Sequence, residues 1–198
     1  MKRSELVGDS WTKILAWFAR HAPDQIDGFR APATEPDLRA VEEAMGVRLP
    51  ADQRAWWRLA DGTDEERLIE LVPMAFRPLS TGRARKFHRG IVDLAPKVPE
   101  LPEWMAEPAG SPTYGTWLPQ WLPVARDFGG DFLFLDLRRG PRFGCVGIHR
   151  NDDWQYDGPD WPNVAAMLAE VAGALTGGTE FDRWHAGVED GCLTWLMD

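Results

Sequence analysis

The segment of residues 131–137, DFLFLDL, carries apolar side chains at both alternating sets of positions. A strand with one face in water alternates apolar and polar residues, whereas a strand covered on both faces is apolar throughout. The segment therefore predicts a central strand of a sheet. Any fold of this chain has to place other parts of the chain over both faces of that strand.

Further strands are predicted on either side of this segment, at residues 121–126 and 143–149. The glycine-containing turns at residues 128–130 and 139–141 are too short for a crossover, so the three strands are antiparallel neighbours. A fourth strand is expected at residues 67–72, where a proline ends the apolar run.

Four helices are predicted from apolar residues that recur at the spacing of one helical face. They cover about residues 10–20, a segment with Thr34 as N-cap, a segment around residues 55–60, and residues 164–175. A tight turn separates the second helix from the third, and we expect these two to form a helical hairpin. The order of elements predicts an α+β fold, with a mixed or antiparallel twisted sheet flanked by helices.

The chain of 198 residues has the length of one domain, with a core at about residues 10–177. Residues 178–198 contain several tryptophans and leucines, so we expect this C-terminal extension to pack on the body. Residues 81–115 lack a clear period and are expected to form irregular surface, with one short helix near Val92 or Trp104.

The net charge, the apolar runs and the cysteines limit which partners and which cellular location are expected. A net charge of −9 disfavours nucleic-acid binding and favours a basic protein partner, although it also serves solubility alone. No apolar run approaches the roughly 20 residues of a membrane span. The N-terminus lacks a secretory pattern, and Cys145 and Cys192 are expected as reduced thiols in the cytoplasm.

The sequence contains no glycine-rich phosphate loop and no nucleophile-elbow motif. Cys145 and His149 lie four residues apart on a predicted strand, about 13 Å at strand rise, which is too far for one zinc ion. His149 also lies near Asp152 and Asp153, but no nucleophile accompanies this acid–base pair. We therefore expect no catalytic residue, no metal and no cofactor, and an enzyme is the least favoured interpretation.

Two acidic loops are the better candidates for a functional site. One follows the third helix, and the other precedes the last helix and contains aromatic residues. Carboxylates beside aromatic rings are typical of protein-binding surfaces, although solvated loops have similar composition. The candidate protein-binding residues are Asp61, Asp64, Glu65, Glu66, Asp131, Asp152, Asp153, Trp154, Tyr156 and Asp157.

Two stretches resemble the SUKH superfamily, which includes cell-wall assembly regulators and bacterial toxin-immunity proteins. Residues 34–62 are similar to its opening pair of helices, with Gly46, Leu49-Pro50 and Asp61-Gly62 at the matching positions. Residues 121–149 resemble its middle strands, with matches at Leu122-Pro123, Gly130-Asp131 and Asp136.

The resemblance implies an α+β fold and a non-catalytic role in binding proteins. It favours an immunity-type protein that neutralises a cognate toxin, whose toxin domain would be the basic partner. The alternative is a regulatory or scaffold protein with an endogenous partner. A monomer or weak homodimer is expected, and the family supplies no catalytic residues to carry over.

Overall fold

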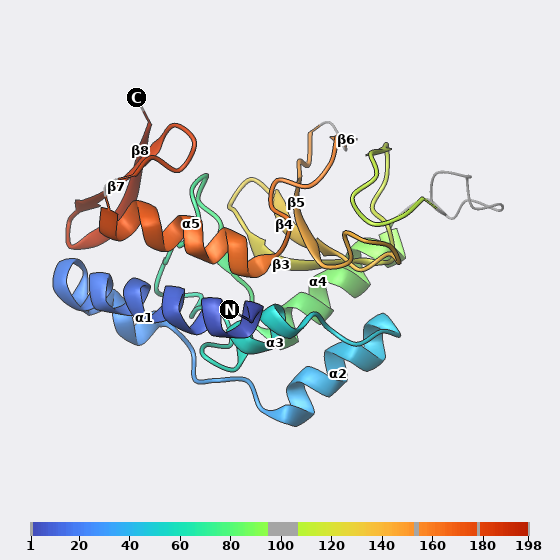
Figure 1. Cartoon of the computed structure of the whole chain (residues 1–198), viewed down its shortest axis with the longest axis horizontal. Helices are drawn as coiled ribbons and strands as arrows, with labels where there is room; N and C mark the ends of the chain where they lie inside the picture. The colour runs from blue at the N-terminus through green and yellow to red at the C-terminus, as the bar shows by residue number, and fades with distance from the viewer. Residues whose placement is uncertain (1, 95–106, 153–154, 178, 198) are drawn as a thin grey trace.

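The computed structural model describes residues 2–94, 107–152, 155–177 and 179–197. Helices and antiparallel sheets make up the chain (Figure 1), which confirms the α+β prediction. The elements in order are α1 (Arg3–His21), the 3-10 helix η1 (Pro23–Gly28), α2 (Glu35–Met45), α3 (Ala51–Trp57), β1 (Arg77–Pro78), α4 (Thr81–Leu94), β2 (Thr113–Tyr114), β3 (Trp121–Arg126), β4 (Phe132–Asp136), β5 (Cys145–His149), β6 (Gln155–Tyr156), α5 (Val164–Gly177), β7 (Trp184–Glu189) and β8 (Cys192–Met197).

The main sheet has four antiparallel strands in the order β1-β3-β4-β5. β4 lies between β3 and β5, and all five of its residues are buried. The prediction of a central strand covered on both faces is confirmed, as are the two neighbouring strands. Burial on both faces removes every β4 side chain from water, which makes this strand the centre of the core.

The strand predicted at residues 67–72 is wrong. Met74 and Ala75 adopt positive φ angles of 66° and 62°, and the backbone of Val72 pairs with that of Phe76 across this turn. The segment thus folds back on itself instead of joining the sheet. The edge position beside β3 is taken by β1, five residues further along the chain.

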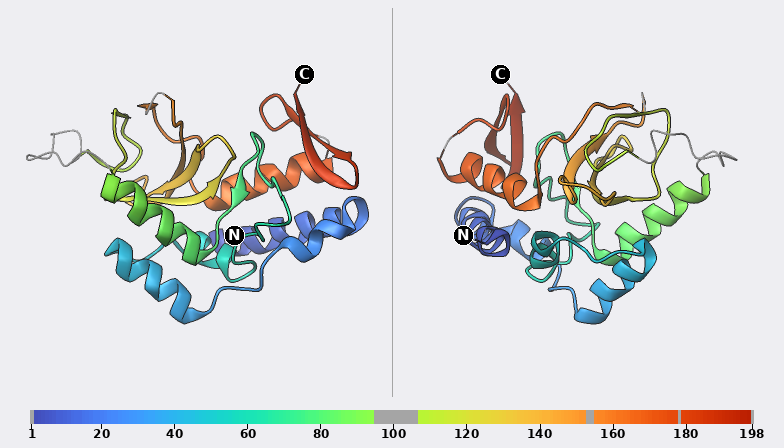
Figure 2. Two further views of the ribbon diagram at one scale, coloured as in Figure 1. Left: turned by 180° about the vertical axis from the view of Figure 1, so that it is seen from behind. Right: turned by 45° about the vertical axis from the view of Figure 1, so that its right-hand side comes forward.

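The helices cover the sheet in two groups (Figures 1 and 2). α1 runs alongside α5 and α3 packs against α1, while α4 lies against β3 and α2 packs on α4. The predicted N-cap Thr34 accepts a hydrogen bond from the Asp37 backbone, and Gly46 ends α2 with a φ of 65°. No helix in the described part of the chain is long and apolar enough to span a membrane.

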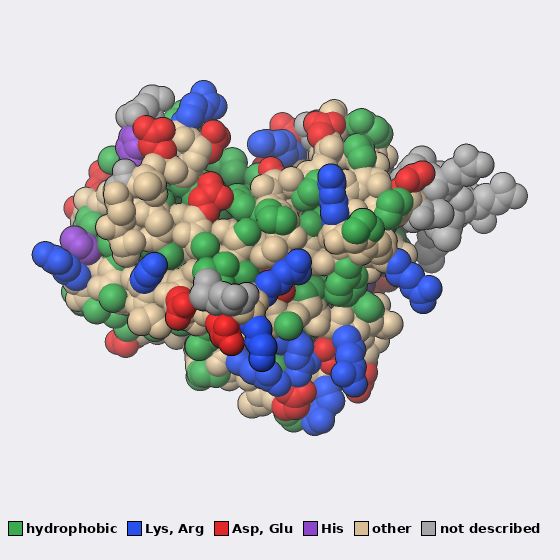
Figure 3. Space-filling view, viewed as in Figure 1, with side chains coloured by type: hydrophobic (Ala, Val, Ile, Leu, Met, Phe, Trp, Pro, Cys, Tyr) green, Lys and Arg blue, Asp and Glu red, His purple; other side chains and the backbone are tan. Residues whose placement is uncertain are grey.

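The short connection between α2 and α3 is as predicted, and the apolar faces of the two helices pack on other elements, α2 on α4 and α3 on α1. Ion pairs connect the two helices instead, and basic and acidic side chains are mixed over them in Figure 3. The guanidinium nitrogens of Arg54 lie 2.6 Å from a carboxylate oxygen of Glu35 and 2.7 Å from one of Glu42. A guanidinium nitrogen of Arg58 lies 2.6 Å from the other carboxylate oxygen of Glu35. Hydrogen bonds from Arg58 and Arg54 lower the pKa of the exposed Glu35 carboxyl group.

Residues 81–94 form the helix α4, so the prediction of irregular structure is wrong for this stretch. Ala84, Phe87 and Ile91 recur at helical spacing and pack on the core, while Lys86 and Arg89 are exposed. Charged residues between these positions obscured the helical period in the sequence. Val92 lies within α4, whereas Trp104 lies outside the described residues.

The C-terminal segment forms the β7–β8 hairpin. Phe181, Leu193 and Trp195 are buried, and the indole Nε1 of Trp195 donates a hydrogen bond of 2.8 Å to the Glu70 carbonyl. The hairpin therefore packs on the loop before β1 and on the neighbouring helices, with the start of β8 beside η1.

Candidate functional site

The first acidic loop, residues 61–66, is shaped by two of its own carboxylates. Asp61 accepts hydrogen bonds from the Thr81 backbone at 2.7 Å and the Thr81 hydroxyl at 3.1 Å, which places it at the start of α4 as a cap. Asp64 accepts a hydrogen bond of 2.8 Å from the Glu66 backbone. These two residues form the loop and leave Glu65 and Glu66 exposed to solvent.

Glu66 borders a groove of about 600 Å³, which we call the acidic groove. Its walls come from η1, from residues 66–68 at the end of the acidic loop, and from the start of β8. The fold thus brings together three segments that are far apart in the sequence. The groove is lined by Pro23, Asp24, Gln25, Asp27, Glu66, Arg67, Leu68 and Cys192.

The acidic groove combines an apolar surface with carboxylates. Leu68 is 48% exposed and gives the groove its apolar surface. Asp24, Asp27 and Glu66 are exposed around it. Arg67 is the one cationic side chain among the described residues that line the groove. Its guanidinium donates a hydrogen bond of 2.9 Å to the Asp24 carbonyl and lies 3.9 Å from the Asp27 carboxylate. Such a groove suits a lysine or arginine side chain, which has an aliphatic stem and a cationic end.

One buried amide holds the walls of the groove in place. The side chain of Gln25 donates a hydrogen bond of 2.9 Å to the Leu68 carbonyl and accepts one of 2.8 Å from the Leu193 backbone. Gln25 is only 6% exposed, so both bonds are shielded from water. The groove is therefore formed before any partner binds.

The second acidic loop is less complete as a site. Asp131 accepts a hydrogen bond of 2.8 Å from the Asn151 backbone, so the turn between β3 and β4 lies against this loop. Asp152 and Asp157 are exposed, and Asp157 accepts a hydrogen bond of 2.6 Å from the Gln155 amide. The candidate residues Asp153 and Trp154 lie outside the described residues.

The prediction of Tyr156 as a surface anchor is wrong. Tyr156 is 2% exposed, and its ring packs edge-on against Trp121 and Phe134. Alternation along the short strand β6 points Tyr156 inward and Gln155 outward. The sequence alone could not assign these directions, because a two-residue strand gives no period.

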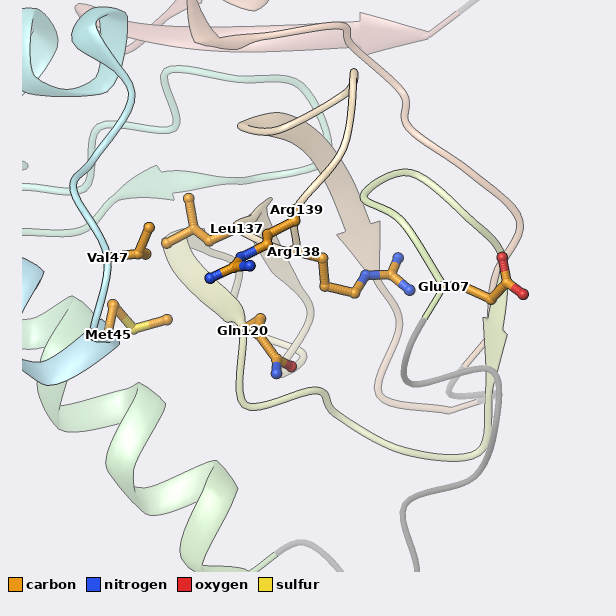
Figure 4. A pocket seen from close by; sticks show the side chains of 8 residues that line it. Met45, Val47, Glu107, Gln120, Leu137, Arg138 and Arg139 are labelled. Carbon is orange, nitrogen blue, oxygen red and sulfur yellow. The ribbon is translucent and has the colours of Figure 1, made fainter.

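A second cavity of about 380 Å³ lies between the end of α2 and the segment after β4 (Figure 4). Arg138 and Arg139 point in opposite directions there, with Arg139 toward Met45 and Val47. Arg138 is 4% exposed and pairs with the buried Asp136 at 2.6 Å. No histidine, cysteine, serine or threonine is among the described residues that line this cavity, so it offers no nucleophile beside a base.

The titratable groups beside β5 are also poor candidates for catalysis. Burial raises the pKa of the Cys145 thiol to about 11, and it raises the pKa of the Tyr156 hydroxyl as well. His149 is 3% exposed and lies against Trp117, with 5.1 Å between ring centroids. Among the described residues, no cluster of three or more His, Cys, Asp or Glu side chains is arranged to hold a metal ion.

Sequence reasoning found Glu66 but missed Asp24, Gln25 and Asp27. The sequence does show two aspartates three residues apart after Pro23, which is a weak indication of an acidic turn. Nothing in it shows that the C-terminal hairpin would complete the groove, because that contact joins residues at opposite ends of the chain.

A protein-family model and two curated proteins match this chain. The model of the SMI1 / KNR4 family (SUKH-1) matches residues 32–170. The cell wall assembly regulator SMI1 of Saccharomyces cerevisiae is 23% identical over 167 residues, which cover 67% of this chain and 33% of that protein. A glucan synthesis regulatory protein of Neurospora crassa is 25% identical over 201 residues, covering 83% of this chain and 38% of that protein.

This chain therefore spans about a third of the length of the two curated relatives that it matches. The family match includes the acidic loop and the central strands. It does not include η1 or β8. Two of the three walls of the acidic groove thus lie outside the part of the chain that matches the family.

Proposed function

This chain belongs to the SMI1/KNR4 family (SUKH-1), and we propose that it is a non-catalytic, regulatory protein-binding module. The observation that carries the proposal is the acidic groove, which is preformed and partly apolar, with three carboxylates around it. The two fungal relatives carry names of regulators, which supports the regulatory role.

The proposed partner is a basic protein that inserts a lysine or arginine side chain into the groove. Its aliphatic stem would cover Leu68, and its cation would approach Asp24, Asp27 and Glu66. The net charge of −9 would speed the approach of such a partner. Charge complementarity thus supports both the rate and the orientation of binding.

Neutralisation of a cognate toxin remains a prediction from the resemblance, and it is a narrower form of the same binding role. The flanking genes separate the two interpretations, because a toxin gene next to this one favours immunity. The cytoplasmic location and the monomeric or weakly dimeric state also remain predictions.

Neutralising the groove is expected to weaken capture of the partner. The variant is Asp24→Asn/Asp27→Asn/Glu66→Gln, and all three side chains are exposed, so the fold should be retained. We expect about a tenfold or greater loss of affinity and a weaker dependence on salt. The measurement is a quantitative pull-down from the source cells, followed by binding kinetics with the protein that is captured.

The matched control is Asp9→Asn/Glu43→Gln/Glu180→Gln, which changes the net charge equally at three other exposed positions. This control should retain nearly full affinity. Equal losses in both triple variants would reduce the effect to net charge and would contradict a specific role of the groove.

A further inference from the structure

Three arginines converge beside Glu65 of the acidic loop, whereas the acidic groove lies beside Glu66. We call these three arginines the arginine cluster. Arg77 comes from β1, Arg83 from α4 and Arg126 from β3. They border a small cavity of about 30 Å³, enough for about one water molecule. The lining residues are Thr63, Asp64, Glu65, Arg77, Pro78, Leu79, Arg83 and Arg126.

Sheet pairing and aromatic rings hold the cluster together. Arg77 and Arg126 are direct partners in the antiparallel pairing of β1 with β3. The Arg77 guanidinium lies 3.8 Å from the centre of the Phe128 ring, and that of Arg126 lies 4.9 Å from the centre of Phe87. Arg83 also lies over Phe87, at 5.3 Å. These contacts fix the positions of the three cations before any anion arrives.

The positive charge of the cluster is only partly compensated. The Nε atoms of Arg77 and Arg126 are buried without a hydrogen-bond partner. Within the described part of the chain, Arg83 alone of the three forms an ion pair, with Glu65 at 2.6 Å. Burial lowers the pKa of Arg77, and the nearby Arg83 and Arg126 lower it further, against the opposite effects of Glu70 and Asp127. The three arginines are half-buried and close together. An anion among them would offset their mutual repulsion and could accept a hydrogen bond from a buried Nε atom, so an added anion would be stabilising.

We propose that the arginine cluster is a binding site for a phosphate monoester and that the Glu65 carboxylate occupies part of it when no ligand is bound. A phosphate monoester brings about two negative charges and three terminal oxygens, which suits three guanidinium groups better than one carboxylate does. The Glu65 side chain is 68% exposed, so it can leave toward solvent. Its departure would enlarge the cavity, which is too small for a phosphate while Glu65 is in place.

This site goes beyond the proposed function. The acidic groove would select a basic side chain, whereas the arginine cluster selects an anion. Glu65 and Glu66 are adjacent in the chain, but one faces the cluster and the other borders the groove. The failure of either proposal therefore leaves the other intact.

The test is a titration of the full chain with O-phosphoserine and with inorganic phosphate, followed by NMR of the arginine Nε–H signals. We expect saturable shifts of Arg77 and Arg126. Glu65→Gln should tighten binding about two- to fivefold, because it removes a competing carboxylate held by a partly exposed ion pair. Glu43→Gln, an exposed position of α2 with the same charge change, is the matched control and should leave the affinity unchanged.

Arg126→Gln should weaken binding about tenfold or more, while Arg89→Gln, at an exposed position of α4, should not. Tighter binding of O-phosphoserine assigns the site to a phosphorylated side chain, and tighter binding of inorganic phosphate assigns it to the free ion. Absence of saturable shifts in both the unmodified protein and Glu65→Gln would overturn the proposal. The Glu65→Gln result remains decisive even if Arg126→Gln fails to fold.

Discussion

Replacing Asp136 with alanine is expected to lower the free energy of unfolding by about 3–5 kcal/mol. Asp136 is fully buried at the end of β4, and its carboxylate accepts hydrogen bonds from Arg138 and from the Gly110 and Arg138 backbones. The truncation leaves the buried Arg138 guanidinium without its counter-ion, and it also releases the loop that contains Gly110. Chemical denaturation of the purified protein measures this change.

A double variant separates the loss of the ion pair from the loss of the backbone contacts. In Asp136→Leu/Arg138→Met both charges are removed, so no unpaired ion remains in the core. We expect this variant to be more stable than Asp136→Ala but less stable than the unmodified protein, because the Gly110 and Arg138 amides still lack an acceptor. A single Asp136→Ala loss below about 1 kcal/mol would show that the pair is not a principal support of this loop.

Phe134→Ala is expected to lower the free energy of unfolding by about 3–5 kcal/mol as well. Phe134 is fully buried in β4, stacked on Trp121 with 4.1 Å between ring centroids and in edge contact with Tyr156 at 5.1 Å. The Phe134 ring packs directly on the backbone of Gly147 in β5, where a Cβ atom would lie only 2.8 Å from the ring. Removing the ring therefore leaves a large cavity that the rigid neighbouring rings cannot close.

Phe128→Ala is the matched control for this truncation. Phe128 is 59% exposed and contacts the Arg77 guanidinium, so its loss should cost less than about 1 kcal/mol. Similar losses at Phe128 and Phe134, measured in the same denaturant, would contradict the placement of β4 at the centre of the core.

The sequence predicted the parts of the fold that depend on local periodicity. β3, β4, β5 and α5 follow from runs whose pattern is set by their own burial. The strand at residues 67–72 was predicted wrongly because most of its apolar residues are buried in a segment that does not pair with the sheet. Most of α4 was missed because its many charged residues obscure the helical period, although a short helix near Val92 was expected.

The candidate site likewise has parts that the sequence predicted and parts that depend on contacts between distant segments. Composition alone identified the acidic loop, and Glu65 and Glu66 are indeed exposed. The groove beside Glu66 depends on Gln25 and on the start of β8, which meet only in the folded chain. The arginine cluster likewise joins β1, β3 and α4, and its three members are scattered over fifty residues of sequence.

Cross-linking from Cys192 tests the central claim, that a protein partner binds in the acidic groove. Cys192 is exposed and lines the groove, whereas the buried Cys145 has a pKa raised to about 11 and should not react with a thiol-directed photo-cross-linker. The control carries the same label at Glu43→Cys in a Cys192→Ser background. That position lies on α2, on the far side of the molecule from the β7–β8 hairpin (Figures 1 and 2).

We expect the label at position 192 to cross-link a protein from the source cells and the label at position 43 not to. The yield at position 192 should fall when Asp24, Asp27 and Glu66 are neutralised. Cross-linking of the same protein from position 43 with a yield equal to or greater than that from position 192 would contradict binding in the groove.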